Sequence, residues 1–158
     1  MFNTHKNFKS AVLPAVVCSI LGLSCVSLEA KGDEYIWGLT AYKNGEYSKA
    51  FELFKLSAES GAAKSQLILS TMYRQGLGVE QNEYEGFYWC KQAAEQEVLE
   101  AKFQLGIMYM EGEGVSDDED EAIKWLWDAS SQGYPQATEM LQYVFSEEFD
   151  IEEANIGC

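Results

Sequence analysis

One segment of this sequence occurs twice. MYRQGLGV at residues 72–79 returns as MYMEGEGV at residues 108–115, at an offset of 36 residues. Other pairs that coincide at the same offset are Leu69 with Leu105, Trp89 with Trp125, and Ala93 with Ala129. Many matches at one fixed offset indicate an internal repeat, and this period is typical of solenoids built from pairs of helices.

Each repeat has the apolar spacing of a helix with one buried face. Leu69, Met72 and Tyr73 lie at i, i+3 and i+4, and the next repeat has the same spacing. Small residues recur where two helices must approach closely: Gly38, Ser70 and Gly106. A glycine inside a helix costs about 1 kcal/mol relative to alanine, so we expect close packing to compensate at these positions.

The ends of the predicted helices carry signals of their own. Gly76 and Gly112 end the first helix of a unit, because glycine adopts the left-handed conformation at little cost. Asn82 with Glu85 starts the second helix with the spacing of a capping box. In such a box the first side chain accepts a hydrogen bond from the third amide, and the acid reaches back to the first amide. Asp118 and Glu121 repeat this spacing one unit later.

The pattern predicts an all-α fold, a right-handed α-solenoid of helix-turn-helix repeats. We place the repeat domain at residues 31–146, with units at 33–61, 63–97 and 99–133 and a closing helix at 136–146. Residues 147–158 are acidic with scattered apolar positions, and we expect a tail that is frayed or lightly docked.

Residues 1–30 have the layout of a secretory signal peptide. Lys6 and Lys9 precede an uncharged apolar run, and small residues follow it. The sequence is compatible with cleavage after Ala30 or after Ser27. Two alternatives are an uncleaved membrane anchor and a lipid attached at Cys25. We therefore expect an exported protein in the periplasm or outside the cell, with membrane contact only through such an anchor.

Charge and composition argue against several classes of function. The formal net charge is −15, which disfavours nucleic acid and anionic membrane as partners. The single histidine, His5, lies in the predicted signal, and the chain has no Ser-x-x-Lys sequence. Zinc sites built from Cys and His, and serine or cysteine nucleophiles activated by His, are thus not expected. We predict no catalytic residue, no metal ligand, no cofactor and no small-molecule substrate.

The segment LGIMYMEGEGVSDDEDEAIKWLWDASSQG at 105–133 resembles the Sel-one-like repeat, a longer-looped subclass of the tetratricopeptide repeat. Residues 63–97 match this pattern less fully, and residues 36–58 resemble an ordinary tetratricopeptide unit. Proteins of this family are mostly scaffolds and adaptors, often exported in bacteria, and their concave surface receives a peptide or a helix. The resemblance therefore implies a protein-interaction scaffold.

The family's groove positions transfer onto the first helix of each unit. They correspond to Tyr35, Leu39, Tyr42, Lys64, Leu67, Thr71, Arg74, Phe103, Ile107, Met110 and Tyr143. Leu67 and Phe103 have a second interpretation, packing against the neighbouring helix. Arg74 is either a ligand for a peptide carboxylate or one half of an ion pair with an acid of the chain.

Two further features leave alternatives open. Trp127, with Ile123 one turn before it, forms either an exposed apolar patch or a surface covered by the tail. Cys90 and Cys158 form either a disulfide in an oxidising compartment or two separate thiols.

The sequence thus predicts an exported, non-catalytic scaffold that binds a protein or peptide, basic or amphipathic in character because the chain is acidic. The alternative is an enzyme or accessory factor of the cell wall, related to β-lactams or peptidoglycan.

Overall fold

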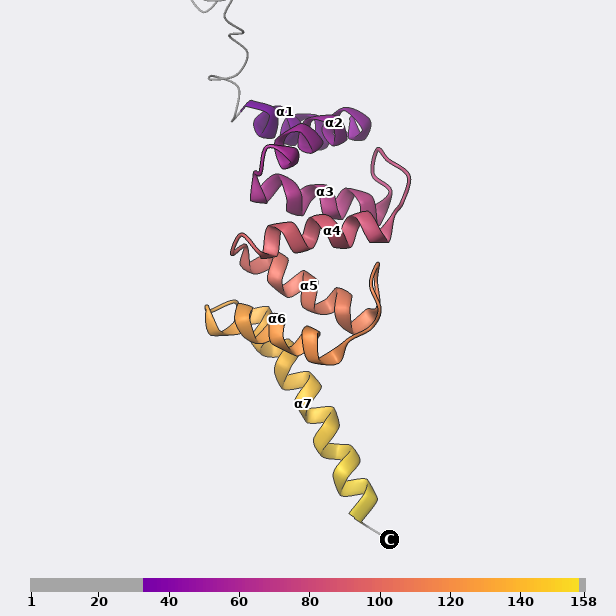
Figure 1. Cartoon of the computed structure of the whole chain (residues 1–158), viewed down its shortest axis with the longest axis vertical. Coiled ribbons are helices and arrows are strands. Elements are labelled where there is room, and N and C mark those ends of the chain that lie inside the picture. Colours follow the sequence, from indigo (N-terminus) through magenta and orange to yellow (C-terminus); the bar gives the residue numbers. More distant parts are fainter. Residues whose placement is uncertain (1–32, 157–158) are drawn as a thin grey trace, which may run out of the picture. The chain divides into compact units, whose positions relative to one another are not determined.

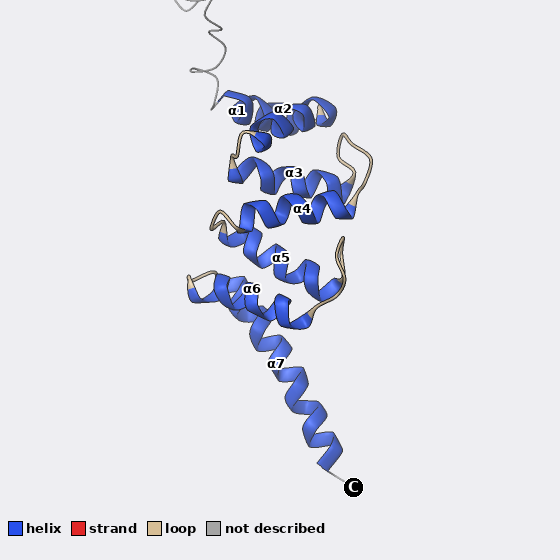
Figure 2. Cartoon of the chain, viewed as in Figure 1, coloured by secondary structure: helices blue, strands red, loops and turns tan. Residues whose placement is uncertain are grey.

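The structure is a computed structural model that describes residues 33–156, with side chains through Ser146. This part of the chain contains seven α-helices and no strand, which confirms the all-α solenoid (Figure 2). The helices are α1 (Asp33–Lys43), α2 (Tyr47–Glu59), α3 (Ala63–Gln75), α4 (Glu83–Ala94), α5 (Leu99–Glu111), α6 (Glu119–Ser131) and α7 (Pro135–Ile156). The predicted signal peptide and Cys158 lie outside the described residues.

Each helix packs against the next one in the chain (Figure 1). Helices α1, α3 and α5 are the first helices of their units, and α2, α4 and α6 are the second helices that cover them. The second helix of one unit also packs on the first helix of the next unit, as α2 does on α3 and α4 does on α5. Each of the three core clusters therefore contains residues from both sides of a unit boundary.

Tryptophan seals the boundary between successive units. Trp89 on α4 packs against the first core cluster, which contains Phe51 and Phe54 of α2 together with Leu69 and Met72 of α3. One repeat later, Trp125 on α6 packs against the cluster that contains Ala93 and Ala101. At this repeat position the indole packs against a cluster that spans the boundary between its own unit and the preceding one, and it returns at an offset of 36 residues, from 89 to 125.

The two predicted glycine stops are confirmed. Gly76 (φ 67°) and Gly112 (φ 69°) are left-handed, and their backbone N–H groups donate to the carbonyl oxygens of Met72 and Met108. Gly78 and Gly114 are left-handed as well, and each lies directly on the start of the preceding unit's second helix. A Cβ on Gly114 would overlap the backbone of Glu83. The second glycine of each loop therefore allows the backbones of two successive units to approach closely.

The capping-box prediction is half right. The Asn82 Oδ1 accepts from the backbone N–H of Glu85 at 3.1 Å, and the Asp118 Oδ1 accepts from that of Glu121 at 3.0 Å. The predicted reciprocal bond is absent from the described residues, because the Asn82 backbone N–H donates instead to the carbonyl of Tyr73 at 2.9 Å. Asp118 repeats this bond one unit later by donating to Tyr109 at 2.9 Å. The loop folds back onto the first helix of its own unit. The hydrogen bond to a carbonyl of that helix takes the place of the predicted bond to the acidic side chain.

The closing helix begins at Pro135, close to its predicted start, and continues to Ile156. The helix is therefore longer than predicted from the sequence, which placed its end at residue 146 and an acidic tail beyond it. Residues 147–156 contain neither glycine nor proline, so nothing local interrupts the helix. None of the seven described helices combines the length and the apolar character that a membrane span requires.

Replacing Gly114 by alanine should destabilise the fold by more than the cost of a left-handed alanine. Gly133→Ala is the matched control, because Gly133 has φ 87° and no atom lies within 4 Å of the place where its Cβ would stand. We expect the control to lose about 1–2 kcal/mol of unfolding free energy from its backbone conformation. Gly114→Ala should lose at least about 1 kcal/mol more from steric overlap. Equal midpoints in urea denaturation would contradict the proposed contact between units.

Candidate functional site

The predicted groove residues of the first unit are partly buried. Tyr35, Leu39 and Tyr42 pack against the first core cluster. The Tyr35 ring contacts Phe54 edge-on with centroids 6.1 Å apart, and the Tyr42 ring contacts that of Tyr47 at 5.3 Å. These side chains connect α1 to α2, so only part of their surface is left for a partner.

Three other predicted groove residues contribute to the core. Leu67 is 8% exposed and belongs to the second cluster, which corrects its placement on an open surface. Phe103 and Met110 pack against the third cluster, and the Phe103 ring lies 5.4 Å from that of Tyr134. The packing interpretation of Leu67 and Phe103 is therefore the one that the structure supports. The side chains of Leu67, Phe103 and Met110 therefore face neighbouring helices.

A row of accessible residues remains on the first helices. Thr71, Ile107 and Tyr143 occupy the same repeat position on α3, α5 and α7, and none belongs to a core cluster. Thr71 and Ile107 are half-buried, while Tyr143 is 58% exposed. Lys64 is exposed at the start of α3. We call Thr71, Ile107 and Tyr143 the first-helix row.

Arg74 forms an ion pair with an acid of the chain, as the second interpretation held. Its Nε and a terminal nitrogen donate to the two carboxylate oxygens of Glu113 at 2.8 and 2.5 Å. This bidentate pair connects α3 with the loop that follows α5. A Cβ at Gly86 would collide with the Arg74 side chain, so the missing side chain of Gly86 makes room for the arginine. The Arg74 guanidinium is thus paired with Glu113 and is not available to the carboxylate of a peptide.

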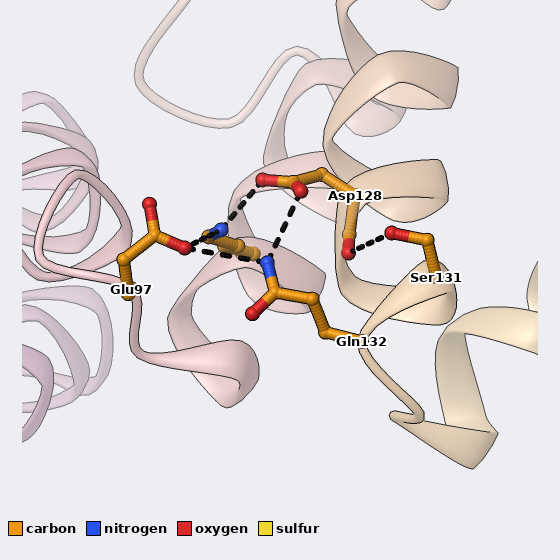
Figure 3. A network of polar contacts seen from close by, with 5 residues as sticks. Glu97, Asp128, Ser131 and Gln132 are labelled. Carbon is orange, nitrogen blue, oxygen red and sulfur yellow. Dashed lines mark hydrogen bonds and ion pairs between the residues drawn. The ribbon is translucent and has the colours of Figure 1, made fainter.

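A buried lysine joins the second and third units. The Lys102 side chain is 1% exposed, and its Nζ donates to Glu97 at 2.5 Å and to Asp128 at 2.6 Å (Figure 3). Gln132 donates to both carboxylates, and Ser131 donates to the Asp128 carbonyl. Burial alone lowers the pKa of Lys102, but its two carboxylate partners outweigh burial and raise that pKa. The ammonium is thus charged and fully paired, as a buried cation must be.

Glu97 is held in a conformation that the other units give to glycine. Its φ is 65°, and Gly61 and Gly133 occupy the equivalent position with φ of 92° and 87°. One repeat earlier than Lys102 stands Gln66, whose amide donates to the Ala58 carbonyl at 3.2 Å. The ion pair therefore replaces an amide contact and holds an unfavourable backbone in place.

Sequence reasoning missed this network, although a signal was present. Glu97 is a glutamate where two units have glycine, and Lys102 lies between Ala101 and Leu105 on a buried face. A charged residue in an apolar stripe requires a partner of opposite charge. Comparing the units position by position would have drawn attention to Glu97 as a partner for Lys102, because it is an acid at a position where two other units have glycine.

Cys90 is buried and chemically quiet. Its thiol donates to the Ala101 carbonyl at 3.4 Å, and burial raises its pKa to about 12. A neutral, enclosed thiol is a poor nucleophile. Cys158 lies outside the described residues, so the predicted Cys90–Cys158 disulfide stays a prediction.

Three hollows on the described surface are lined by residues other than the predicted groove residues. One hollow lies between α1 and α2, beside Trp37 and Leu53, and a polar one lies beside Gln92 and Gln96. A third lies between α6 and α7, where Trp127 is 62% exposed. Trp127 thus has the open apolar surface of the first interpretation, while Ile123 packs against the third cluster. Within the described residues, no group of three or more His, Cys, Asp or Glu side chains is placed to hold a metal ion.

The Sel1 repeat family matches residues 32–61, 63–98 and 99–134. Among curated proteins, an exopolysaccharide production negative regulator of Rhizobium leguminosarum bv. viciae is 33% identical over 93 residues, or 52% of this chain and 35% of the relative. Among solved structures, c5321, a protective antigen of uropathogenic Escherichia coli with an SLR fold, has a TM-score of 0.71 and 33% identity. That match covers 75% of this chain and 26% of c5321.

A Sel1 repeat protein from Oxalobacter formigenes has a TM-score of 0.67 and 31% identity. This second structural match covers 72% of the chain and 47% of that protein. The chain therefore spans less than half the length of each of these relatives, and the matched length consists of helical repeats. These findings confirm the resemblance to Sel-one-like repeats.

Replacing Lys102 by glutamine, the residue of the preceding unit, should cost about 1–3 kcal/mol of unfolding free energy. The change removes the buried cation while Glu97 keeps its left-handed backbone. Lys124→Gln is the matched control, because Lys124 is 68% exposed and pairs only with a near neighbour on its own helix. The control should leave the urea midpoint unchanged. Equal midpoints for the two variants would show that the network adds no stability.

The stabilisation by Lys102 should vanish in acid. Hydrogen bonds from Lys102 hold the pKa values of Glu97 and Asp128 below their ordinary values of 4.5 and 3.8. Carboxylates with lowered pKa values stabilise the fold above their ordinary pKa, and protonation at lower pH removes that contribution. The difference between wild type and Lys102→Gln should stay constant from about pH 6 to 9 and shrink below about pH 5. A difference that persists at pH 3 would contradict the ion-pair interpretation.

Proposed function

We propose that this chain, which belongs to the Sel1 repeat family, is a non-catalytic scaffold that binds a partner protein or peptide along its first helices. Sel1 repeats generally mediate protein–protein interaction. The observation that carries the proposal is the first-helix row, in which Thr71, Ile107 and Tyr143 recur on α3, α5 and α7 outside the core clusters.

The row suits an extended partner because its spacing follows the stacking of the units. A segment lying across α3, α5 and α7 would meet the same repeat position three times. Ile107 supplies an apolar contact at the centre, and Thr71 and Tyr143 lie on either side of it, with the Thr71 hydroxyl donating to the Leu67 carbonyl at 3.2 Å. The net charge of −15 favours a basic partner through long-range attraction. Such attraction should weaken as salt is raised.

The proposed place of action is the periplasm or the exterior of a bacterial cell, because residues 1–30 have the layout of an export signal. An absence of catalysis is supported by the sequence, whose single histidine lies in that segment and which contains no Ser-x-x-Lys. Cell fractionation with mass spectrometry of the mature N-terminus tests the location. Recovery of the intact chain in the cytoplasm would overturn the export half of the proposal.

A second candidate function follows from the similarity to an exopolysaccharide regulator. The chain would then act as a scaffold in a process that limits exopolysaccharide production. The shared segment spans 35% of that relative, so what is shared is the repeat surface and not the whole regulator. Deletion of the gene should raise the amount of secreted polysaccharide, and an unchanged amount would remove this candidate.

Ile107→Asp should abolish partner capture while leaving the fold intact. Ile107 is half-buried and lies outside the clusters, whereas Met110 packs against the core and is unsuited to this test. The control is Leu56→Asp, a leucine on the second helix α2 that is 57% exposed. Cross-linking pull-downs from envelope and medium should lose the partner with Ile107→Asp and keep it with Leu56→Asp, after circular dichroism shows both variants folded.

A partner captured equally by wild type and Ile107→Asp would place binding elsewhere on the molecule. A substrate turned over by the purified mature chain, with a β-lactam reporter or peptidoglycan as the probe, would favour the enzyme alternative instead.

A further inference from the structure

Among the described residues, helix α7 is a first helix on which no second helix packs. In the three preceding units, α1 packs with α2, α3 with α4, and α5 with α6. Helix α7 packs against α6, which belongs to the unit before it. Figure 1 shows α7 starting beside α6, with its remaining length extending past that helix. Among the described residues, no helix takes the place that a second helix would take on α7.

A groove of about 580 Å³ lies at this place. On one side it is lined by Trp127 and Ser130 of α6, and on the other by Leu141, Gln142 and Phe145 of α7. Trp127 and Phe145 are 62% and 43% exposed, which is unusual for large apolar side chains lying close together. None of the predicted groove residues contributes to this lining.

The repeat shows what belongs in the groove. One unit earlier, Leu141 corresponds to Leu105, which is 0% exposed, and Gln142 corresponds to Gly106, which is also buried. Gly106 lies so close to α6 that an added Cβ would come within 2.7 Å of the Leu126 side chain. The face of α5 that corresponds to the α7 side of the groove is therefore covered by the second helix of its own unit. The groove therefore lies where the contact between α5 and α6 would be repeated one unit later.

We propose that the groove between α6 and α7 binds a basic amphipathic helix of a partner protein, which takes the place of a fourth second helix. The apolar face of that helix packs against Trp127, Leu141 and Phe145. Its cations are attracted by the net charge of −15 of the chain. This surface shares no residue with the first-helix row, so the two proposals stand independently.

Charge selects a basic partner over a second copy of this chain. Residues 134–158 contain no lysine or arginine, and their acids are Glu139, Glu147, Glu148, Asp150, Glu152 and Glu153. The first turn of α6 adds Glu119, Asp120 and Glu121. Pairing of two α7 helices would bring like charges together, which disfavours a symmetric dimer. A helix rich in lysine and arginine gains from the same acids.

The test uses the full mature chain and a labelled synthetic peptide of about 18 residues, long enough to form a helix on a surface. Its leucines and alanines recur at i, i+3, i+4 and i+7, and its other positions are lysine and arginine. A scrambled peptide of the same composition lacks the apolar face and controls for charge alone. Fluorescence anisotropy should show binding of the patterned peptide, binding at least about tenfold weaker for the scrambled one, and weaker binding at higher salt.

Trp127→Ala should weaken binding of the patterned peptide by about tenfold or more, the loss typical of a central aromatic contact. Tyr84→Ala is the matched control, because Tyr84 is an aromatic residue of α4 that is 68% exposed and lies outside this groove. Gln142→Lys is a second test, since an exposed residue gains a charge that repels the peptide and fills the groove. Tyr84→Ala should bind as wild type does.

Four results would overturn the proposal: no binding of the patterned peptide, equal binding of the scrambled peptide, equal binding by Trp127→Ala, or equal binding by Gln142→Lys. Sedimentation equilibrium adds a fifth. A dimer of the wild type that Trp127→Ala converts to monomer would assign the groove to a second copy of the chain. A negative result in the peptide-binding experiment leaves the result of the pull-down with Ile107→Asp unaffected, so the two proposals are tested separately.

Discussion

The structure depends on the contact between the second helix of one unit and the first helix of the next. A single pair of helices cannot bury both of its apolar faces, so each unit relies on its neighbour. Trp89 and Trp125 contribute to this contact by packing against core clusters that contain residues of both adjoining units. Gly78 and Gly114 make it by letting a loop touch the backbone of the preceding second helix. The Lys102 network adds a charged contact at one of the same boundaries.

Position in the stack decides which residues are exposed. Trp37 occupies the repeat position of Leu69 and Leu105, yet it is 56% exposed while both leucines are fully buried. No described helix precedes α1, so the side chain that would seal a boundary faces outward. Phe145 is exposed on α7 for the corresponding reason, because no described helix packs on α7 as the second helix of its unit. The two ends of the described solenoid therefore present apolar surface that its middle encloses, which is the physical basis for expecting partners there.

Much of the fold was predictable because its signals are local and repeated. The left-handed stops at Gly76 and Gly112 and the start of α7 at Pro135 required only residue type and spacing. The predicted capping boxes were wrong in their second half, because the Asn82 amide finds the Tyr73 carbonyl, a contact that depends on the folded loop. The site was less predictable for the same reason. Leu67 occupies a groove position in the family pattern, but in this chain it packs beside Cys90 and Ala101.

The central claim is that each helix buries its apolar surface against the helices packed on either side of it. Hydrogen–deuterium exchange of the mature chain tests this claim most directly. We predict the slowest amide exchange in α3, α4 and α5, which have helices packed on both sides and lie farthest from the two ends of the described stack. Exchange should be at least about tenfold faster in α1 and α7, since partial openings at the ends break fewer contacts. Uniform protection across all seven helices would show that the stack opens as one unit, and it would contradict the claim that its ends are exposed for want of a neighbour.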